Sequence, residues 1–161
     1  MPENHPNFAQ LIKALNREKV SFVVVGGLAM IVHGSDYLTS DTDLAVASDP
    51  SNSDSIVRAL APFHPRPFHV PDMKDFPWDA RSIFGDVVSL VTDAGDIDLL
   101  RTIPGVDSFD GLRSRAVTRT VFGEDILVAS IDDLVAMKRS ANRPKDVAHI
   151  AELEALRKLE S

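Results

Sequence analysis

The sequence contains no cysteine, so the chain can form no disulfide bond, no thiolate metal site and no cysteine nucleophile. It also lacks any apolar run near the roughly 20 residues that a helix needs to cross a bilayer. The N-terminal stretch MPENHPNFAQ has neither a basic segment nor an apolar core, so we expect no signal peptide. A cytoplasmic location is therefore the default expectation.

Basic side chains are scarce in the first part of the chain. The whole formal net charge of −7 arises in residues 1–100, which hold 14 acidic and 7 basic side chains, whereas residues 101–161 hold 10 of each. A protein that binds duplex DNA along its length presents a basic surface, because phosphate neutralisation supplies much of the affinity. The composition argues against such a protein and leaves open a local basic patch in the last third.

The hydrophobic content of 44% and the charged content of 25% are those of a globular protein, and 161 residues fit a single domain over 1–161. Apolar and β-branched patterns, with glycine and proline as breaks, predict the elements. Helices are expected over 7–18 and 28–33, from the loop at 49–53 to about 61, from Ser130, and from Pro144 to about 156. Strands are expected over 20–25 and 42–47 and in hairpins at 87–100 and 121–128.

Five prolines between residues 62 and 77 predict extended segments and turns there rather than a helix or a central strand. Strands and helices alternate irregularly along the chain. This order predicts an α+β fold with a mixed β-sheet flanked by helices, and a C-terminal helical part at about 130–157.

Two carboxylates and a glycine pair carry the chemical signal. In a strand, Thr39, Asp41 and Asp43 would point to one face, with alternate side chains about 7 Å apart. Paired carboxylates attract a hard cation such as Mg²⁺, and Gly26-Gly27 after a strand would let a phosphate approach the backbone. Taken singly, a solvated or capping role for the carboxylates and a plain turn for the glycines are the more frequent outcomes.

The combination is more specific, because 13 residues separate Gly27 from Asp41 and a short helix is predicted between them. It resembles the signature of the DNA polymerase β-like nucleotidyltransferase superfamily, and within it the small bacterial branch of abortive-infection and toxin-type nucleotidyltransferases. That branch usually has a basic residue where this sequence has Tyr37. Downstream, the segment 95–100 is similar to the family strand that carries a third carboxylate, with Asp98 the better match and Asp96 on the same face.

The resemblance implies a magnesium-dependent enzyme. Asp41, Asp43 and Asp98 would hold one or two Mg²⁺ ions, and a nucleoside monophosphate would pass from an NTP to a hydroxyl of a tRNA, a protein or a small molecule. Among the residues expected to contact the nucleotide are Gly26, Gly27, Thr39, Lys138 and Lys145. For Lys138 a solvated role is nearly as frequent, and for Lys145 and Arg143 phosphate contact and ion pairing are evenly balanced.

A second hypothesis keeps the fold without the reaction. In that case the chain is a nucleotide-binding or partner-binding module of a toxin–antitoxin-type system, with a homodimer or an antitoxin-like partner. The three carboxylates favour the enzyme, whereas Tyr37 at the usual basic position counts against it.

Overall fold

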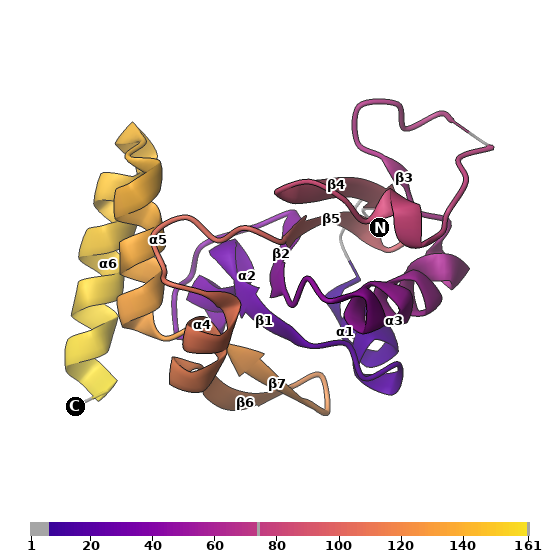
Figure 1. Cartoon of the computed structure of the whole chain (residues 1–161). Coiled ribbons are helices and arrows are strands. Elements are labelled where there is room, and N and C mark those ends of the chain that lie inside the picture. The colour runs from indigo at the N-terminus through magenta and orange to yellow at the C-terminus, as the bar shows by residue number, and fades with distance from the viewer. Residues whose placement is uncertain (1–6, 74, 161) are drawn as a thin grey trace.

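The computed structural model describes residues 7–73 and 75–160. Its centre is a seven-stranded mixed sheet in the order β3-β4-β5-β2-β1-β7-β6 (Figure 1). The pairs β1–β7 and β2–β5 are parallel, and the others are antiparallel. The strands are β1 (Phe22–Val25), β2 (Asp41–Val46), β3 (Arg66–Pro67), β4 (Val87–Thr92), β5 (Gly95–Leu100), β6 (Val117–Val121) and β7 (Glu124–Val128). The predicted α+β fold with a mixed sheet is confirmed.

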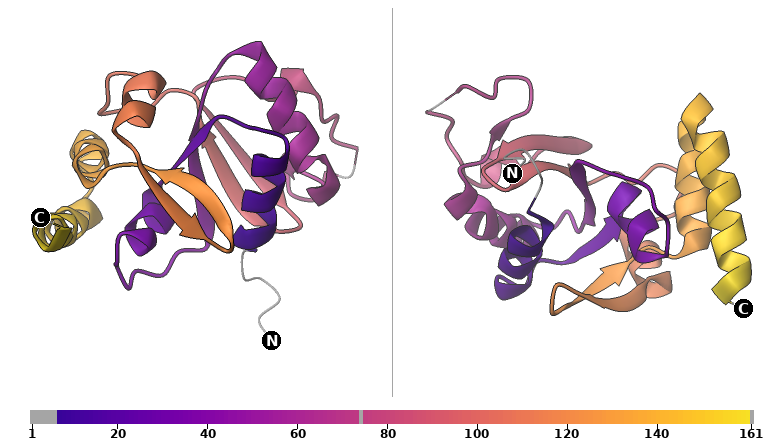
Figure 2. Two further views of the ribbon diagram at one scale, coloured as in Figure 1. Left: turned by 90° about the horizontal axis from the view of Figure 1, so that it is seen from below. Right: turned by 180° about the vertical axis from the view of Figure 1, so that it is seen from behind.

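Six α-helices accompany the sheet in the described chain. They are α1 (Phe8–Arg17), α2 (Gly26–Val32), α3 (Pro50–Leu60), α4 (Phe109–Arg115), α5 (Ile131–Ala141) and α6 (Pro144–Glu160). Helices α1 and α3 lie on one side of β4 and β5, whereas α5 and α6 form a pair at the other side of the molecule (Figure 2). None of the helices in the described ranges is long and apolar enough to cross a membrane.

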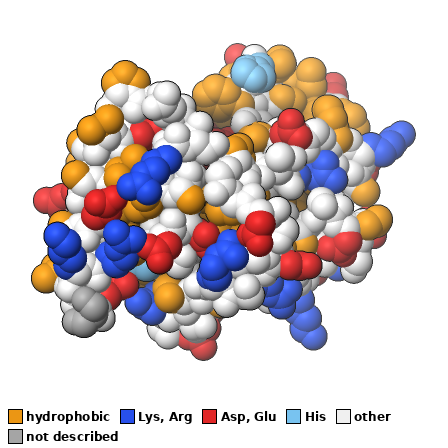
Figure 3. Space-filling view, turned by 60° about the vertical axis from the view of Figure 1, so that its left-hand side comes forward, with side chains coloured by type: hydrophobic (Ala, Val, Ile, Leu, Met, Phe, Trp, Pro, Cys, Tyr) orange, Lys and Arg blue, Asp and Glu red, His pale blue; other side chains and the backbone are white. Residues whose placement is uncertain are grey.

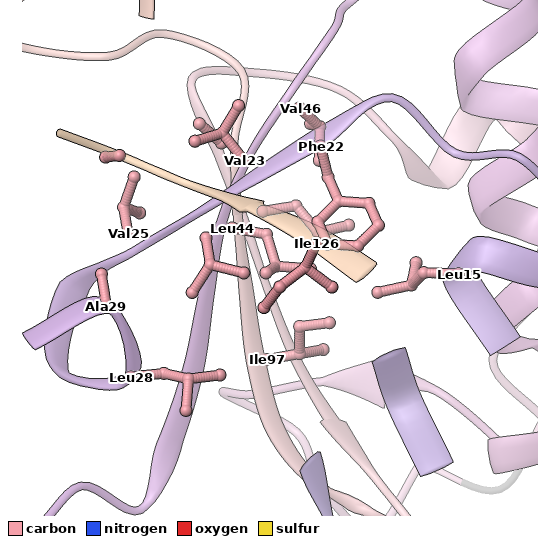
Figure 4. Close-up of a cluster of buried hydrophobic side chains, with 14 of the residues drawn as sticks. Leu15, Phe22, Val23, Val25, Leu28, Ala29, Leu44, Val46, Ile97 and Ile126 are labelled. Carbon is pink, nitrogen blue, oxygen red and sulfur yellow. The ribbon is translucent and has the colours of Figure 1, made fainter. Parts of the chain in front are cut away.

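The core fills the sheet face that α1 and α3 cover. Leu44 of β2 and Ile97 of β5 are fully buried, and Figure 4 shows them gathered with Leu15 of α1 and Ile126 of β7. Because side chains alternate along a strand, burying Leu44 and Ile97 turns their neighbours to the opposite face. The aspartates of β2 and β5 are therefore directed away from this core.

Polar caps fix the ends of several predicted helices. The side chain of Asp49 accepts a hydrogen bond from Asn52 N at the start of α3, and Ser130 accepts one from Asp133 N at the start of α5. Helix α5 ends at Asn142, whose φ of 51° is left-handed, and Pro144 begins α6. These two positions set the turn that carries Arg143.

Some expectations need correction. Helix α4 was not predicted, because Gly111 and two arginines mask its short apolar stripe; the Ser108 side chain caps it. Strand β6 begins at Val117, earlier than expected. Its alternate residues are only partly buried, which weakens the apolar signal. The proline-rich segment does hold extended chain and turns, including β3, while the first residues of the chain lie partly outside the described ranges.

Candidate active site

Strands β2 and β5 bring the predicted carboxylates together. In their parallel register Asp43 lies opposite Asp98, and Asp41 lies opposite Asp96. Adjacent strands are separated by about 4.8 Å, so each pair shares one sheet face at close range. All four side chains are half-buried. The sequence left the choice between Asp96 and Asp98 open, and the register makes Asp98 the partner of Asp43.

A cavity of about 380 Å³ opens beside this carboxylate pair. Asp43, Asp98 and Gly26 line one part of it, and Lys138 and Arg143 line the part that α5 and the following turn provide. Carboxylates and cations from different elements thus line the same cavity. A second cavity, near Trp78, is larger than this one, but neither Asp43 nor Asp98 lines it.

Asp43 occupies an unfavourable electrostatic position. Burial and the nearby carboxylates of Asp98 and Asp41 raise its pKa to about 6, while Lys138 and Arg143 act in the opposite direction. No hydrogen bond or ion pair to the Asp43 carboxylate exists within the described residues. Its charge is therefore left without a bonded partner, as expected of a group that meets a cation from solution.

The glycine pair is required by the packing around Asp43 and Tyr37. Gly26 has a φ of +65°, and a Cβ there would overlap the Asp43 carboxylate. A Cβ at Gly27 would lie 2.8 Å from both Thr39 Oγ1 and Tyr37 Cε2. Both glycines thus let the start of α2 lie directly against the site.

Asp146 of α6 organises the two cations. Its carboxylate accepts hydrogen bonds from Arg143 Nε at 2.9 Å and Arg143 Nη2 at 3.1 Å, and Lys138 Nζ lies 3.6 Å from it. The Asp146 side chain is 2% exposed, and the hydrogen bonds from Arg143 lower its pKa to about 2. Burial lowers the pKa of Lys138, with Asp146 acting in the opposite direction.

Tyr37 lies on the same side of the site. Its ring is edge-on to His149 of α6, with centroids 4.9 Å apart. Burial lowers the pKa of His149. The residue that departs from the family pattern thus packs between Gly27 and α6.

Comparison with known proteins concerns the fold. No protein-family model and no curated protein matches the sequence. The lincosamide antibiotic adenylyltransferase LnuA, solved with lincomycin bound, matches with a TM-score of 0.61 and 13% identity over 95% of this chain and 99% of that one. The antibiotic-resistance factor ANT(2″)-Ia matches with a TM-score of 0.57 and 11% identity over 94% and 81%. A Thermotoga maritima protein assigned as a nucleotidyltransferase matches with a TM-score of 0.51 and 19% identity over 93% and 88%.

The chain has the nucleotidyltransferase fold. The fold predicted from Gly26-Gly27 and from the carboxylates of β2 and β5 is therefore confirmed.

Other predicted site residues of this nucleotidyltransferase fold lie at different distances from the cavity. Thr39 precedes β2, where its Oγ1 accepts a hydrogen bond from Asp41 N at 3.3 Å. Lys145 is exposed in the first turn of α6 and does not line the cavity. Arg143, which the sequence left evenly balanced, does line it. The conformation of the turn between α5 and α6 determines that Arg143 lines the cavity and Lys145 does not. This conformation cannot be predicted from the periodicity of the sequence.

The donor set suits a hard cation that the substrate helps to bind. Within the described ranges no three acidic or histidine side chains are arranged as a ready-made metal site. Mg²⁺, however, often binds through one or two carboxylates and completes its coordination with water and substrate phosphates. The Asp43–Asp98 pair supplies oxygen donors without a bonded partner beside the cavity. These residues fit Mg²⁺ bound together with a nucleotide.

The surface over α5 and α6 mixes charges of both signs, as Figure 3 shows from that side. Arg139 pairs with Glu154 at 2.9 Å, and Arg157 pairs with Asp132. A continuous basic surface is what duplex binding requires. Arg139 and Arg157 on this face are instead balanced locally by acidic side chains.

Proposed function

We propose that this protein transfers a nucleoside monophosphate from an NTP to a hydroxyl acceptor in a Mg²⁺-dependent reaction. The observation that supports it best is the arrangement around the cavity, where Asp43 and Asp98 face Lys138 and Arg143. Carboxylates can hold a cation there while the basic side chains bind phosphate oxygens. The likeness to an antibiotic adenylyltransferase supports the same reaction class.

Asp43 and Asp98 would hold Mg²⁺, and Asp41, which lies two residues before Asp43 on β2 and does not line the cavity, would be a further ligand. When bound, Mg²⁺ would neutralise charge on the phosphates and help to stabilise the transition state. The Asp43 carboxylate must be ionised to bind a cation. Because its pKa is about 6, the site becomes competent as pH rises through that value.

The chain's own cations would position the triphosphate. Arg143 is held by two hydrogen bonds to the buried Asp146, so its guanidinium has a fixed direction. Lys138 reaches the same cavity from α5. The acceptor oxygen would form a bond to the α-phosphorus as the bond to pyrophosphate breaks, and Asp98 would take the hydroxyl proton. Positioning and charge stabilisation would supply most of the catalysis.

The test is nucleotide transfer with α-³²P-labelled NTPs, Mg²⁺ and acceptor mixtures of tRNA, protein and small hydroxyl compounds. We expect a labelled product with the native chain and none with Asp43→Asn or Asp98→Asn. Asp54→Asn, an exposed change of the same charge on α3, is the matched control and should leave labelling unchanged. Labelling that survives both site variants would refute the proposed function.

The alternative is a nucleotide-binding or partner-binding module of a toxin–antitoxin-type system. Tyr37, which stands at the usual basic position, is the observation that favours it. This hypothesis predicts binding of Mg²⁺ and NTP without any labelled acceptor, or a stable complex with a small partner. A homodimer, an antitoxin-like partner and a cytoplasmic location stay predictions from the sequence.

A further inference from the structure

Helices α1 and α3 pack side by side over the core face of the sheet (Figure 2), and a groove of about 290 Å³ runs between them. Lys13 and Arg17 line this groove from α1, and Arg58 lines it from α3. The carboxylates of the candidate site are directed away from the core, so the groove is a separate surface of the molecule. Its apolar part is formed by Ala14, Ala59, Pro62 and Phe63.

Basic side chains are concentrated in this groove, although the surrounding sequence is acidic. Residues 1–100 hold 7 basic side chains against 14 acidic ones, and three of the seven line the groove. Glu18 is the acidic side chain of the described lining, and it already pairs with Arg58 at 3.1 Å. Lys13 and Arg17 are exposed and form no ion pair with any described residue. Two positive charges can therefore meet an anion from outside.

The spacing of these two cations matches that of charges on an acidic helix. Lys13 and Arg17 are four residues apart on α1, so they share one helix face and lie about 6 Å apart along its axis. Carboxylates one turn apart on another helix repeat the same spacing. The exposed Pro62 and the half-buried Phe63 would contact an apolar side chain of that helix. A helix with acidic residues beside apolar ones is thus complementary to the groove in charge and in polarity.

A long polyanion fits the groove less well than a short acidic helix. Nucleic acids are held largely by phosphate neutralisation, so their affinity grows with the number of cations that they contact. The groove offers two cations without an ion pair in the described chain, and Asp54 is exposed one turn before Arg58 on α3. A strand of RNA that extends beyond the groove would meet such acidic side chains, whereas a short helix can be confined to it.

We propose that the groove between α1 and α3 is a docking surface for an acidic amphipathic helix of a partner protein. Carboxylates of that helix pair with Lys13 and Arg17, and one of its apolar side chains packs on Pro62 and Phe63. The inference does not depend on the proposed reaction, because the carboxylates of the candidate site lie on the other face of the sheet. A docked partner would leave that site open.

The experiment is a titration of the ¹⁵N-labelled chain at low ionic strength, followed by backbone amide NMR. The probe is a synthetic helical peptide of about 15 residues, with glutamates one turn apart beside leucines. Its control has glutamine in place of every glutamate. We expect the glutamate peptide to shift the amides of residues 13–18 and 58–63. The glutamine peptide should bind about tenfold more weakly, because two exposed ion pairs are lost.

Charge reversal in the chain tests which cations are involved. Lys13→Glu combined with Arg17→Glu changes only exposed side chains and should weaken binding of the glutamate peptide at least about tenfold. Arg113→Glu is the matched control, since Arg113 of α4 is also exposed and forms no ion pair with a described residue; it should leave binding unchanged. Adding Mg²⁺ and a non-hydrolysable ATP analogue should not alter peptide binding, so this inference and the proposed function can fail separately.

Several results would overturn the docking surface. Equal binding of the two peptides, or equal binding of the glutamate peptide to the native chain and to the double variant, would contradict it. Shifts of the same amides by oligouridine at lower concentrations than by the peptide would identify a nucleic-acid surface instead. Shifts that depend on the concentration of the chain alone would make the occupant a second copy.

Discussion

Replacing Asp43 by asparagine should make the metal-free protein more stable while it abolishes transfer. An ordinary aspartate has a pKa of 3.8, whereas burial and two neighbouring carboxylates raise that of Asp43 to about 6. One unit of pKa difference corresponds to about 1.4 kcal/mol, so the ionised Asp43 lowers the stability of the folded chain by about 3 kcal/mol at neutral pH. Asparagine has a similar shape and carries no charge.

The pH dependence follows from the sign of this difference. Between pH 6 and about 4 the folded chain keeps a proton that the unfolded chain releases. The contribution of Asp43 to stability therefore becomes more favourable as pH falls through this window, and the cost is fully present above it. We expect Asp43→Asn to be more stable than the native chain by about 1–3 kcal/mol at pH 8. The gap should close near pH 4.

The assay is urea unfolding followed by circular dichroism at pH 4, 6 and 8, in buffer with a chelator. For a domain of this size, each kcal/mol also raises Tm by about 2–4 °C. Asp54→Asn controls for the general relief of a net charge of −7. The reasoning is wrong if Asp43→Asn is no more stable than the native chain at pH 8, or if the gain is the same at pH 4.

Three other changes test the remaining parts of the site. Gly26→Ala should lower the free energy of unfolding by more than Gly123→Ala, because both have positive φ but only Gly26 is crowded; equal losses would contradict this. Asp146→Ala should lower stability by about 3 kcal/mol and raise KM for the NTP, since it leaves two cations unpaired; an unchanged KM would contradict a role in nucleotide binding. Tyr37→Phe keeps the ring beside Gly27, so Tm should not change, and a changed KM for the NTP would identify the hydroxyl as a contact.

Much of the fold was predictable because its signals are local. The apolar strand before Gly26 and the alternating Asp41 and Asp43 can be read from a few neighbouring residues. Helix α4 escaped prediction since seven residues provide too little periodicity to stand out from a loop. The hairpin of β6 and β7 was predicted, but the first part of β6 escaped because its polar alternate residues face solvent.

The site was predictable only in part, because it depends on contacts between distant segments. The pairing of Asp43 with Asp98 follows from β5 lying parallel to β2, and only the family resemblance hinted at it. The positions of Arg143 and Asp146 depend on the left-handed turn at Asn142. No periodic pattern distinguishes Arg143, which lines the cavity, from Lys145, which does not.

The burial of Asp146 explains why the site keeps charges of both signs available. Lys138 and Arg143 could have paired with Asp43 directly, and that pairing would have removed the raised pKa. They bind Asp146 instead, so two cations share one buried carboxylate and one positive charge remains for an anion. Asp43 meanwhile keeps a charge that no bonded group offsets. In a magnesium–nucleotide complex the Mg²⁺ ion would offset the negative charge of Asp43, and the phosphates would pair with Lys138 and Arg143. Binding of the complex would therefore remove the electrostatic cost of ionising Asp43 and neutralise the remaining positive charge at the same time.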